Sequence, residues 1–201
     1  MMYFTGEFHA DVGIMFEILE EIPFYSGSER QKMTRHSNKD GKMGSMCYGY
    51  TWKGFLKRDK EGNKISRKQS PYPGLYLTKV MELYPHLHDI FAEFASLHFP
   101  DFEYTSVQMN RNFPCPRHID SKNIGESVLL NIGNYTGGEL VVEYEDGDKI
   151  INNINSLYRF NGSKYHHYTL PFTGTRYALV FFKNNQVLSV IKKCQNVKSC
   201  P

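Results

Sequence analysis

The chain has 201 residues, of which 40% are apolar and 22% charged, as is ordinary for one globular domain. No apolar run reaches the ~18 residues that suggest a membrane span, and the N-terminus lacks the basic and apolar segments of a secretory signal. None of the four cysteines forms a CxxC pair, which argues against a thiolate zinc site and favours a reducing compartment. We therefore expect an intracellular (cytoplasmic or nuclear) monomer without membrane contact.

The net charge of +3 is unevenly distributed along the chain. The stretch from Arg30 to Lys68 has 12 basic and 3 acidic residues, so its local charge is +9. Such a stretch is either a polyanion-binding face or a solvated loop. Tyr48, Tyr50 and Trp52 lie within it at alternate positions, which suits base stacking or, alternatively, packing of one strand face into the core. Nucleic acid is therefore a candidate partner.

The first hundred residues contain the predicted helices. Residues 11–20 resemble a short helix with Asp11 as its N-cap, and residues 46–53 are strand-like. Residues 57–70 are basic and loop-like. Apolar side chains follow at helical spacing over residues 74–98, and Pro85 marks a break between two helices.

After Pro100, short apolar and aromatic segments alternate with turn signals and no helix intervenes. The predicted strands are 103–113, 127–133, 138–144, 149–153, 156–160, 165–170 and 176–183. This pattern indicates a mainly β protein with N-terminal helices (α+β), whose core is a barrel or double-sheet jelly roll. We expect one domain with a helical, basic part over 1–100, a β core over 101–190 and a tail over 191–201.

A possible metal site lies in the sequence His118-Ile119-Asp120. Residues i and i+2 of an extended segment share a face, so this imidazole and carboxylate can bind the same metal ion. The pair His166-His167 offers a third ligand, and only one of these adjacent residues can point inward. Two histidines and one carboxylate form the facial triad of non-haem Fe(II) oxygenases. Alone, however, an HxD sequence often arises by chance on a surface.

Arg176 begins a predicted strand and shares a face with Ala178 and Val180. If that face lines the interior, the buried guanidinium needs an anion, and a ligand carboxylate in a bidentate pair would supply it. The alternative is that the opposite face, which carries Tyr177 and Leu179, is the buried one.

Together these segments resemble the iron(II)- and 2-oxoglutarate-dependent dioxygenases, and especially their TET/JBP-like branch, which oxidises the 5-methyl group of pyrimidine bases. The resemblance spans about residues 104–183. The matching segments are Gln108–Asn112, His118–Asn123, Gly133–Leu140, Phe160–His166 and Pro171–Tyr177.

The resemblance implies a double-stranded β-helix that uses Fe(II), 2-oxoglutarate and O2 and converts 2-oxoglutarate to succinate. It makes His118, Asp120 and His166 the iron ligands and catalytic centre. His166 is preferred to His167 because Arg176, the implied anchor of the distal carboxylate of 2-oxoglutarate, follows it by ten residues.

The resemblance also implies that Asn123, three residues after the Asp, contacts the target base. On the strand before the HxD sequence, Asn110 is expected to contact 2-oxoglutarate and Asn112 the substrate, unless that amide face is simply solvated. Two departures stand out. Ala178 occupies a position where many of these oxygenases have Ser, and Asn112 a position where AlkB-like relatives have Tyr.

The expected activity is therefore oxidation of the methyl group of 5-methylcytosine or thymine in nucleic acid. Two alternatives stay open: a protein hydroxylase acting on Pro, Lys or Asn, and a non-enzymatic cupin-like metal-binding module. The Arg176 anchor discriminates against the latter, because a binding module has no need of it.

Overall fold

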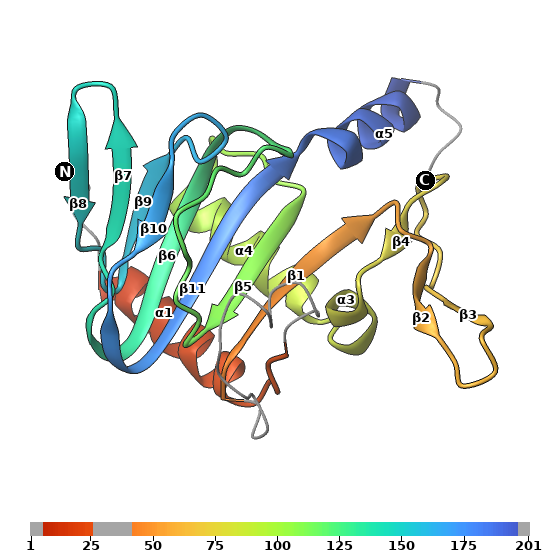
Figure 1. Ribbon diagram of the computed structural model, residues 1–201, viewed down its shortest axis with the longest axis horizontal. Coiled ribbons are helices and arrows are strands. Elements are labelled where there is room, and N and C mark those ends of the chain that lie inside the picture. The colour runs from red at the N-terminus through yellow and green to blue at the C-terminus, as the bar shows by residue number, and fades with distance from the viewer. Residues whose placement is uncertain (1–5, 26–41, 197–201) are drawn as a thin grey trace. The chain divides into compact units, whose positions relative to one another are not determined.

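A computed structural model describes residues 6–25 and 42–196 (Figure 1). Residues 30–41 of the basic stretch and 197–201 of the predicted tail lie outside the described residues. The helices are α1 (Gly6–Glu20), α3 (Lys79–Leu83), α4 (Leu87–His98) and α5 (Asn185–Asn196). The strands are β1 (Gly44–Thr51), β2 (Phe55–Arg58), β3 (Lys64–Ser66), β4 (Tyr76–Leu77), β5 (Ser106–Arg111), β6 (Asn123–Gly137), β7 (Leu140–Tyr144), β8 (Gly147–Ile151), β9 (Ser156–Phe160), β10 (His167–Thr169) and β11 (Phe172–Asn184).

Most predicted elements are confirmed, and three predictions need correction. Pro85 does separate α3 from α4. The first helix begins at Gly6, because its buried apolar stripe already starts at Phe8, so Asp11 lies inside the helix and is no N-cap. Residues 57–70 are not all loop, since they include part of the β2–β3 hairpin. The helix α5 stands where the end of the β core and the tail were expected.

The chain divides into two compact units, each built from two stretches of sequence. The first unit comprises residues 1–46 and 108–181, and the second comprises 47–107 and 182–201, in so far as these residues are described. Strands β1, β5 and β11 contribute residues to both units. The predicted single domain stays a prediction.

The first unit has the strand arrangement of a jelly roll. One sheet has the order β1-β5-β11-β6-β9, and a second has the order β10-β7-β8 (Figure 1). An isolated antiparallel bridge between His118 and His167 adds the segment around His118 beside β10. The second sheet is thus extended by this segment. Counting the segment, consecutive strands from β5 to β11 lie in opposite sheets except β7 and β8, which pair with each other in the second sheet. The expected mainly β fold with a double-stranded β-helix core is confirmed.

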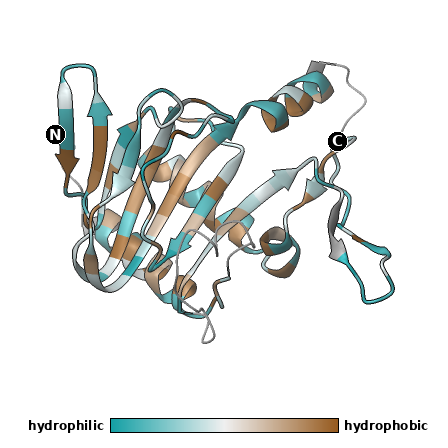
Figure 2. Ribbon diagram, in the orientation of Figure 1, coloured by the Kyte–Doolittle hydropathy of each residue, from teal (hydrophilic) through white to brown (hydrophobic). Residues whose placement is uncertain are grey.

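Side chains from both sheets form the core of this unit. The cluster consists of Leu129, Leu140, Val142, Phe160 and Ala178, which come from β6, β7, β9 and β11. The opposite face of β11 is covered as well, because Phe16 of α1 packs edge-on against Tyr177 with ring centroids 5.7 Å apart. Figure 2 shows the hydrophobic stretches along β6 and β11. Both faces of β11 are therefore buried, and its alternation alone does not decide where Arg176 points.

In the second unit, residues of β1 pair with β4 in the register Tyr50↔Leu77. Tyr48 packs edge-on against Phe91 of α4, and its hydroxyl donates to the carbonyl of Pro85 at 3.3 Å. Trp52 is 43% exposed. Tyr48 is therefore a core residue, as the packing alternative predicted, and Trp52 is the exposed aromatic of the three. No helix in the described part of the chain is long and apolar enough to cross a membrane.

Candidate metal centre

Two imidazoles and one carboxylate meet at the second sheet of the first unit. Ligand atoms of His118, Asp120 and His167 all lie within 4.8 Å of one another. The Nε2 atom of His118 is 3.5 Å from Oδ1 of Asp120, and Nε2 of His167 is 3.8 Å from Oδ2. Each ring therefore lies near a different oxygen of the same carboxylate. Two imidazoles and one carboxylate are the donor set of a facial triad.

Backbone pairing explains why these three side chains converge. His118 and His167 exchange two hydrogen bonds, N–H to carbonyl, at 3.1 and 3.0 Å. Residues paired directly across two strands project to the same face of a sheet. The N–H of Asp120 donates to the carbonyl of Gly162 at 2.9 Å, so both ends of the HxD segment are held to neighbouring chain.

The structure brings His167, and not the predicted third ligand His166, to the other two residues. The carbonyl of His166 accepts the N–H of Glu143 at 2.9 Å, while His167 lies opposite both Val142 and His118. Adjacent strand residues face opposite ways, so His166 cannot join the group from this register. Arg176 follows the observed histidine by nine residues rather than ten.

Backbone carbonyls orient both rings for metal binding. Nδ1 of His118 lies 2.7 Å from the carbonyl of Pro116, and Nδ1 of His167 lies 3.1 Å from that of Tyr165. A ring that donates its Nδ1–H to a carbonyl keeps the lone pair of Nε2 for a metal. Since both Nε2 atoms approach Asp120, the donor set fits a divalent ion such as Fe(II).

The charges at this centre also favour a cation. Burial opposes protonation of His118, but its hydrogen bonds to Asp120 and Cys115 raise the pKa of this ring to about 10. Burial and the neighbouring charge of His118 lower the pKa of His167. Without metal, a proton on His118 offsets the carboxylate, and a bound metal ion would replace that proton.

Arg176 lies in the same unit with an incompletely satisfied guanidinium. The residue is 3% exposed, and its Nη2 donates to Oδ1 of Asn131 at 2.9 Å. Its buried Nε has no hydrogen-bond partner among the residues that the structure describes. Burial lowers the pKa of Arg176, although Tyr135 and Cys115 act in the opposite direction. The thiol of Cys115 lies 3.7 Å from the ring of His118, so it borders the triad.

The three predicted asparagines occupy different surroundings. Asn110 is buried and its Oδ1 accepts from the hydroxyl of Ser45. The side chain of Asn112 bonds to two backbone segments. Its Oδ1 accepts the N–H of Arg176 at 2.8 Å, and its Nδ2 donates to the carbonyl of Lys42. Asn123 is half-buried at the start of β6, where its N–H donates to the carbonyl of Asp120 at 2.9 Å. Their roles as ligand contacts stay predictions.

Sequence reasoning missed Asn131, Asn153 and Gly162. Asn131 is 1% exposed and interrupts the apolar run of β6, which is a signal that a polar partner must be buried with it. Gly162 carries no comparable signal. Its importance follows from the fold, since a Cβ there would lie 3.1 Å from Cε1 of His167 and 3.3 Å from Oδ2 of Asp120.

We expect Gly162→Ala to weaken metal binding about tenfold, the lower end of the effect of disturbing ligand orientation. The added methyl group would also lie 3.0 Å from Phe160, so His167 and Asp120 would have to shift. Titration calorimetry with Mn(II) measures the affinity. Gly13→Ala is the control, because a Cβ there meets no atom within 4 Å. Equal affinities in the two variants would contradict this account of the site.

Comparison with known proteins finds solved structures that are similar to this chain, but no sequence match. No protein-family model matches the chain, and no curated protein matches it. Among solved structures, the chain is similar to NgTET1 in complex with 5mC DNA, at 17% identity, covering 90% of this chain and 75% of that one, with a TM-score of 0.47. It is also similar to a Trichoplax adhaerens prolyl hydroxylase in complex with a hypoxia inducible factor peptide, at 16% identity, 93% and 83% coverage and a TM-score of 0.46. A Burkholderia pseudomallei oxidoreductase of the 2OG-Fe(II) oxygenase family matches at 17% identity, 64% and 65% coverage and a TM-score of 0.38.

Proposed function

We propose that this chain is an Fe(II)- and 2-oxoglutarate-dependent dioxygenase. The observation that carries the proposal is the triad of His118, Asp120 and His167, together with a buried Arg176 whose Nε lacks a partner within residues 6–25 and 42–196. A triad alone would suit many metal sites. A buried guanidinium without a carboxylate partner in the described part of the chain adds the requirement for an anionic ligand.

The residues of the chain have separate tasks in this proposal. His118, Asp120 and His167 would hold the iron through three positions and leave the others for 2-oxoglutarate and O2. Bound iron and 2-oxoglutarate supply the oxidative chemistry. Arg176 would fix the distal carboxylate of 2-oxoglutarate, and the core side chains beneath the triad would exclude water.

A binding experiment separates this function from a cupin-like metal-binding module. Mn(II) replaces Fe(II) without redox chemistry, so titration of 2-oxoglutarate into Mn(II)-loaded protein measures the cosubstrate site alone. We expect saturable binding with one 2-oxoglutarate per chain. A protein that binds Mn(II) but neither 2-oxoglutarate nor a related dicarboxylate would be a metal-binding module instead.

For the substrate, we propose a 5-methylpyrimidine base, 5-methylcytosine or thymine, in nucleic acid. Two features support this class. The stretch from Arg30 to Lys68 carries a local charge of +9, and neutralising phosphates would make binding salt-dependent. The backbone N–H of Asn123 donates to the carbonyl of Asp120, so a residue whose side-chain amide can both donate and accept follows closely on the proposed ligands. A methyl group would reach the metal only if its base were flipped out of the stack.

We expect Asn123→Ala to depress oxidation of the target base while DNA binding changes little. The substitution removes a base-edge contact but no phosphate contact, and base contacts carry specificity. Loss of one good base contact corresponds to roughly 1–3 kcal/mol, or about 5- to 150-fold in rate. The measurement is base oxidation by mass spectrometry, with Mn(II) and 2-oxoglutarate affinities as controls. Unchanged oxidation would remove Asn123 from the substrate site.

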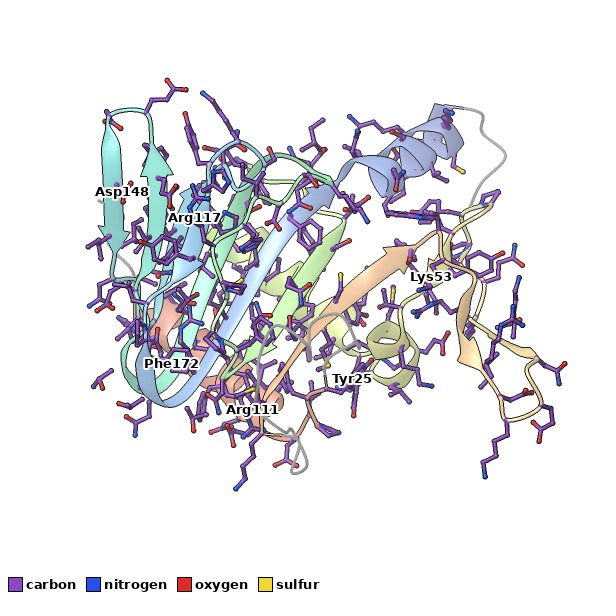
Figure 3. The ribbon with its side chains drawn as sticks, viewed as in Figure 1. Tyr25, Lys53, Arg111, Arg117, Asp148 and Phe172 are labelled. Carbon is purple, nitrogen blue, oxygen red and sulfur yellow. The ribbon has the colours of Figure 1, made fainter. Side chains whose placement is uncertain are left out.

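A protein substrate is the second candidate, because the β7–β8 hairpin near the metal centre is acidic. Glu143 follows Val142, which pairs with His167. Glu145 and Asp146 form the turn, and Asp148 lies on β8 opposite Glu143. Carboxylates repel phosphates and attract basic peptides. Glu143 is held by Arg117 at 2.6 Å, which reduces this repulsion (both Arg117 and Asp148 are labelled in Figure 3). Binding of DNA and RNA measured at several salt concentrations distinguishes the two substrate classes. No binding at any salt concentration would favour a peptide substrate.

A further inference from the structure

Arg176 is held by a neutral amide where a carboxylate is the usual partner of a buried arginine. Its Nη2 donates to Oδ1 of Asn131 at 2.9 Å, and the rings of Tyr135 and Phe172 lie 5.7 and 5.5 Å from its guanidinium carbon (Phe172 is labelled in Figure 3). No Asp or Glu pairs with it in the described part of the chain. The positive charge of this guanidinium is therefore fixed in place without being cancelled.

The amide of Asn131 is itself locked in one orientation. Its Nδ2 donates to Oδ1 of Asn153 at 2.7 Å, and both residues are buried. If the amide were flipped, its NH2 group would face the donors of Arg176 and its oxygen would face an acceptor. The two contacts therefore exclude the flipped amide, and Oδ1 must point at the guanidinium.

Main-chain contacts hold Asn153 beside β6. The N–H of Asn155 donates to the carbonyl of Asn131 at 2.7 Å, and Asn131 forms a parallel bridge with Ile154. The Nδ2 group of Asn153 donates to the carbonyl of Ser156 at a longer distance of 3.4 Å. The asparagine pair is thus supported by the segment between β8 and β9.

We propose that Asn131, oriented by Asn153, is a positioning residue that aims Arg176 and leaves its charge available to a carboxylate of the ligand. A carboxylate at position 131 would have nearly the same shape but would form an internal ion pair with Arg176. The neutral amide supplies the hydrogen bond without that competition, and Nε stays unpartnered for the ligand. This inference rests on the proposed function, because the ligand in question is the 2-oxoglutarate dicarboxylate.

The decisive variant is Asn131→Asp, which changes charge and almost no volume. We expect 2-oxoglutarate to bind Mn(II)-loaded protein at least about tenfold more weakly, because the new carboxylate neutralises the anchor. Mn(II) affinity should stay within about twofold of wild type. The ligand-free variant should melt no lower than wild type, because Arg176 gains a partner and Asn153 can turn its NH2 group toward the new oxygen by giving up only its longer contact.

Two further variants separate positioning from a packing defect. Asn131→Ala removes the acceptor, so both the melting temperature and 2-oxoglutarate affinity should fall. If Asn131 served only packing, Asn131→Asp would also lower both the melting temperature and the 2-oxoglutarate affinity. The proposal instead predicts that Asn131→Asp weakens ligand binding without loss of stability. Asn134→Asp is the matched control: it is the same substitution on an exposed residue of the same strand and should alter neither property.

The outcomes distinguish this inference from the function on which it rests. If wild type and Asn131→Asp bind 2-oxoglutarate equally well, the role of Asn131 is refuted and the dioxygenase proposal stands. If Asn131→Asp loses binding but also melts lower, as the Ala variant does, Asn131 is only a packing residue. If the Mn(II)-loaded wild type binds no dicarboxylate, the proposed function fails first and the inference with it. Weaker binding in Asn131→Asp with undiminished stability supports the proposal.

Discussion

Replacing His167 by Ala should abolish metal binding at physiological metal concentrations, with at least about a 100-fold loss of affinity. The variant would leave one imidazole and one carboxylate of the three converging groups. Removing only a group that hydrogen-bonds to a metal ligand already costs 10- to 100-fold in affinity, so removing a ligand itself should cost more. The expected result in Mn(II) calorimetry is no measurable binding, with the melting temperature recorded to show that the variant folds.

His166→Ala is the control for this prediction, because it removes the adjacent imidazole and leaves the triad complete. Its metal affinity should stay within about threefold of wild type. The register of β10 with β7 makes the two variants opposite in effect, since His167 faces the same side as its cross-strand partner His118. Loss of metal in His166→Ala with retention in His167→Ala would mean that the strand is shifted by one residue.

Arg176→Lys should weaken 2-oxoglutarate binding by roughly 1–3 kcal/mol, or about 5- to 150-fold, while metal affinity stays nearly constant. Lysine keeps the charge but loses the planar fork that binds a carboxylate through two parallel hydrogen bonds. It would also have to satisfy Asn131 with the same ammonium group. Calorimetry with Mn(II)-loaded protein measures the change.

Arg111→Lys is the matched control, because this arginine pairs with Glu20 at 3.2 Å on the face of the sheet that α1 covers. Its substitution should leave 2-oxoglutarate affinity unchanged. If Arg176→Lys and Arg111→Lys both bind 2-oxoglutarate like wild type, the dicarboxylate is anchored by another residue, and the buried guanidinium needs a different explanation.

Local patterns in the sequence predict most of the fold. Alternating apolar residues and turn signals locate the strands after Pro100, and Pro85 locates the break between helices, because these signals depend on neighbouring residues. Because Asp11 resembles an N-cap, the local sequence predicts that the first helix begins there. Burial of Phe8 extends α1 to Gly6 instead. Burial depends on what the helix packs against, and a local pattern does not contain that information.

The sequence predicts the types of side chain at the candidate site, but not the strand register that decides which histidine joins them. His118 and Asp120 share a face by local geometry alone, so the HxD sequence is sufficient to predict that these two side chains converge. The choice between His166 and His167 depends on which residue lies opposite His118, and that is a contact across 49 positions of sequence. The partnership of Asn131 with Arg176 joins two different strands in the same way.

Succinate formation from 2-oxoglutarate tests the central claim most directly. Purified protein would be incubated with Fe(II), 2-oxoglutarate and O2, together with methylated DNA, methylated RNA or peptide substrates, beside His167→Ala and Arg176→Lys. The account predicts succinate that requires Fe(II) and O2, is absent with His167→Ala, falls with Arg176→Lys at low 2-oxoglutarate and returns toward wild type when 2-oxoglutarate is saturating. Succinate formation that is equal in wild type and His167→Ala, or absent with every substrate although metal and 2-oxoglutarate both bind, would contradict it.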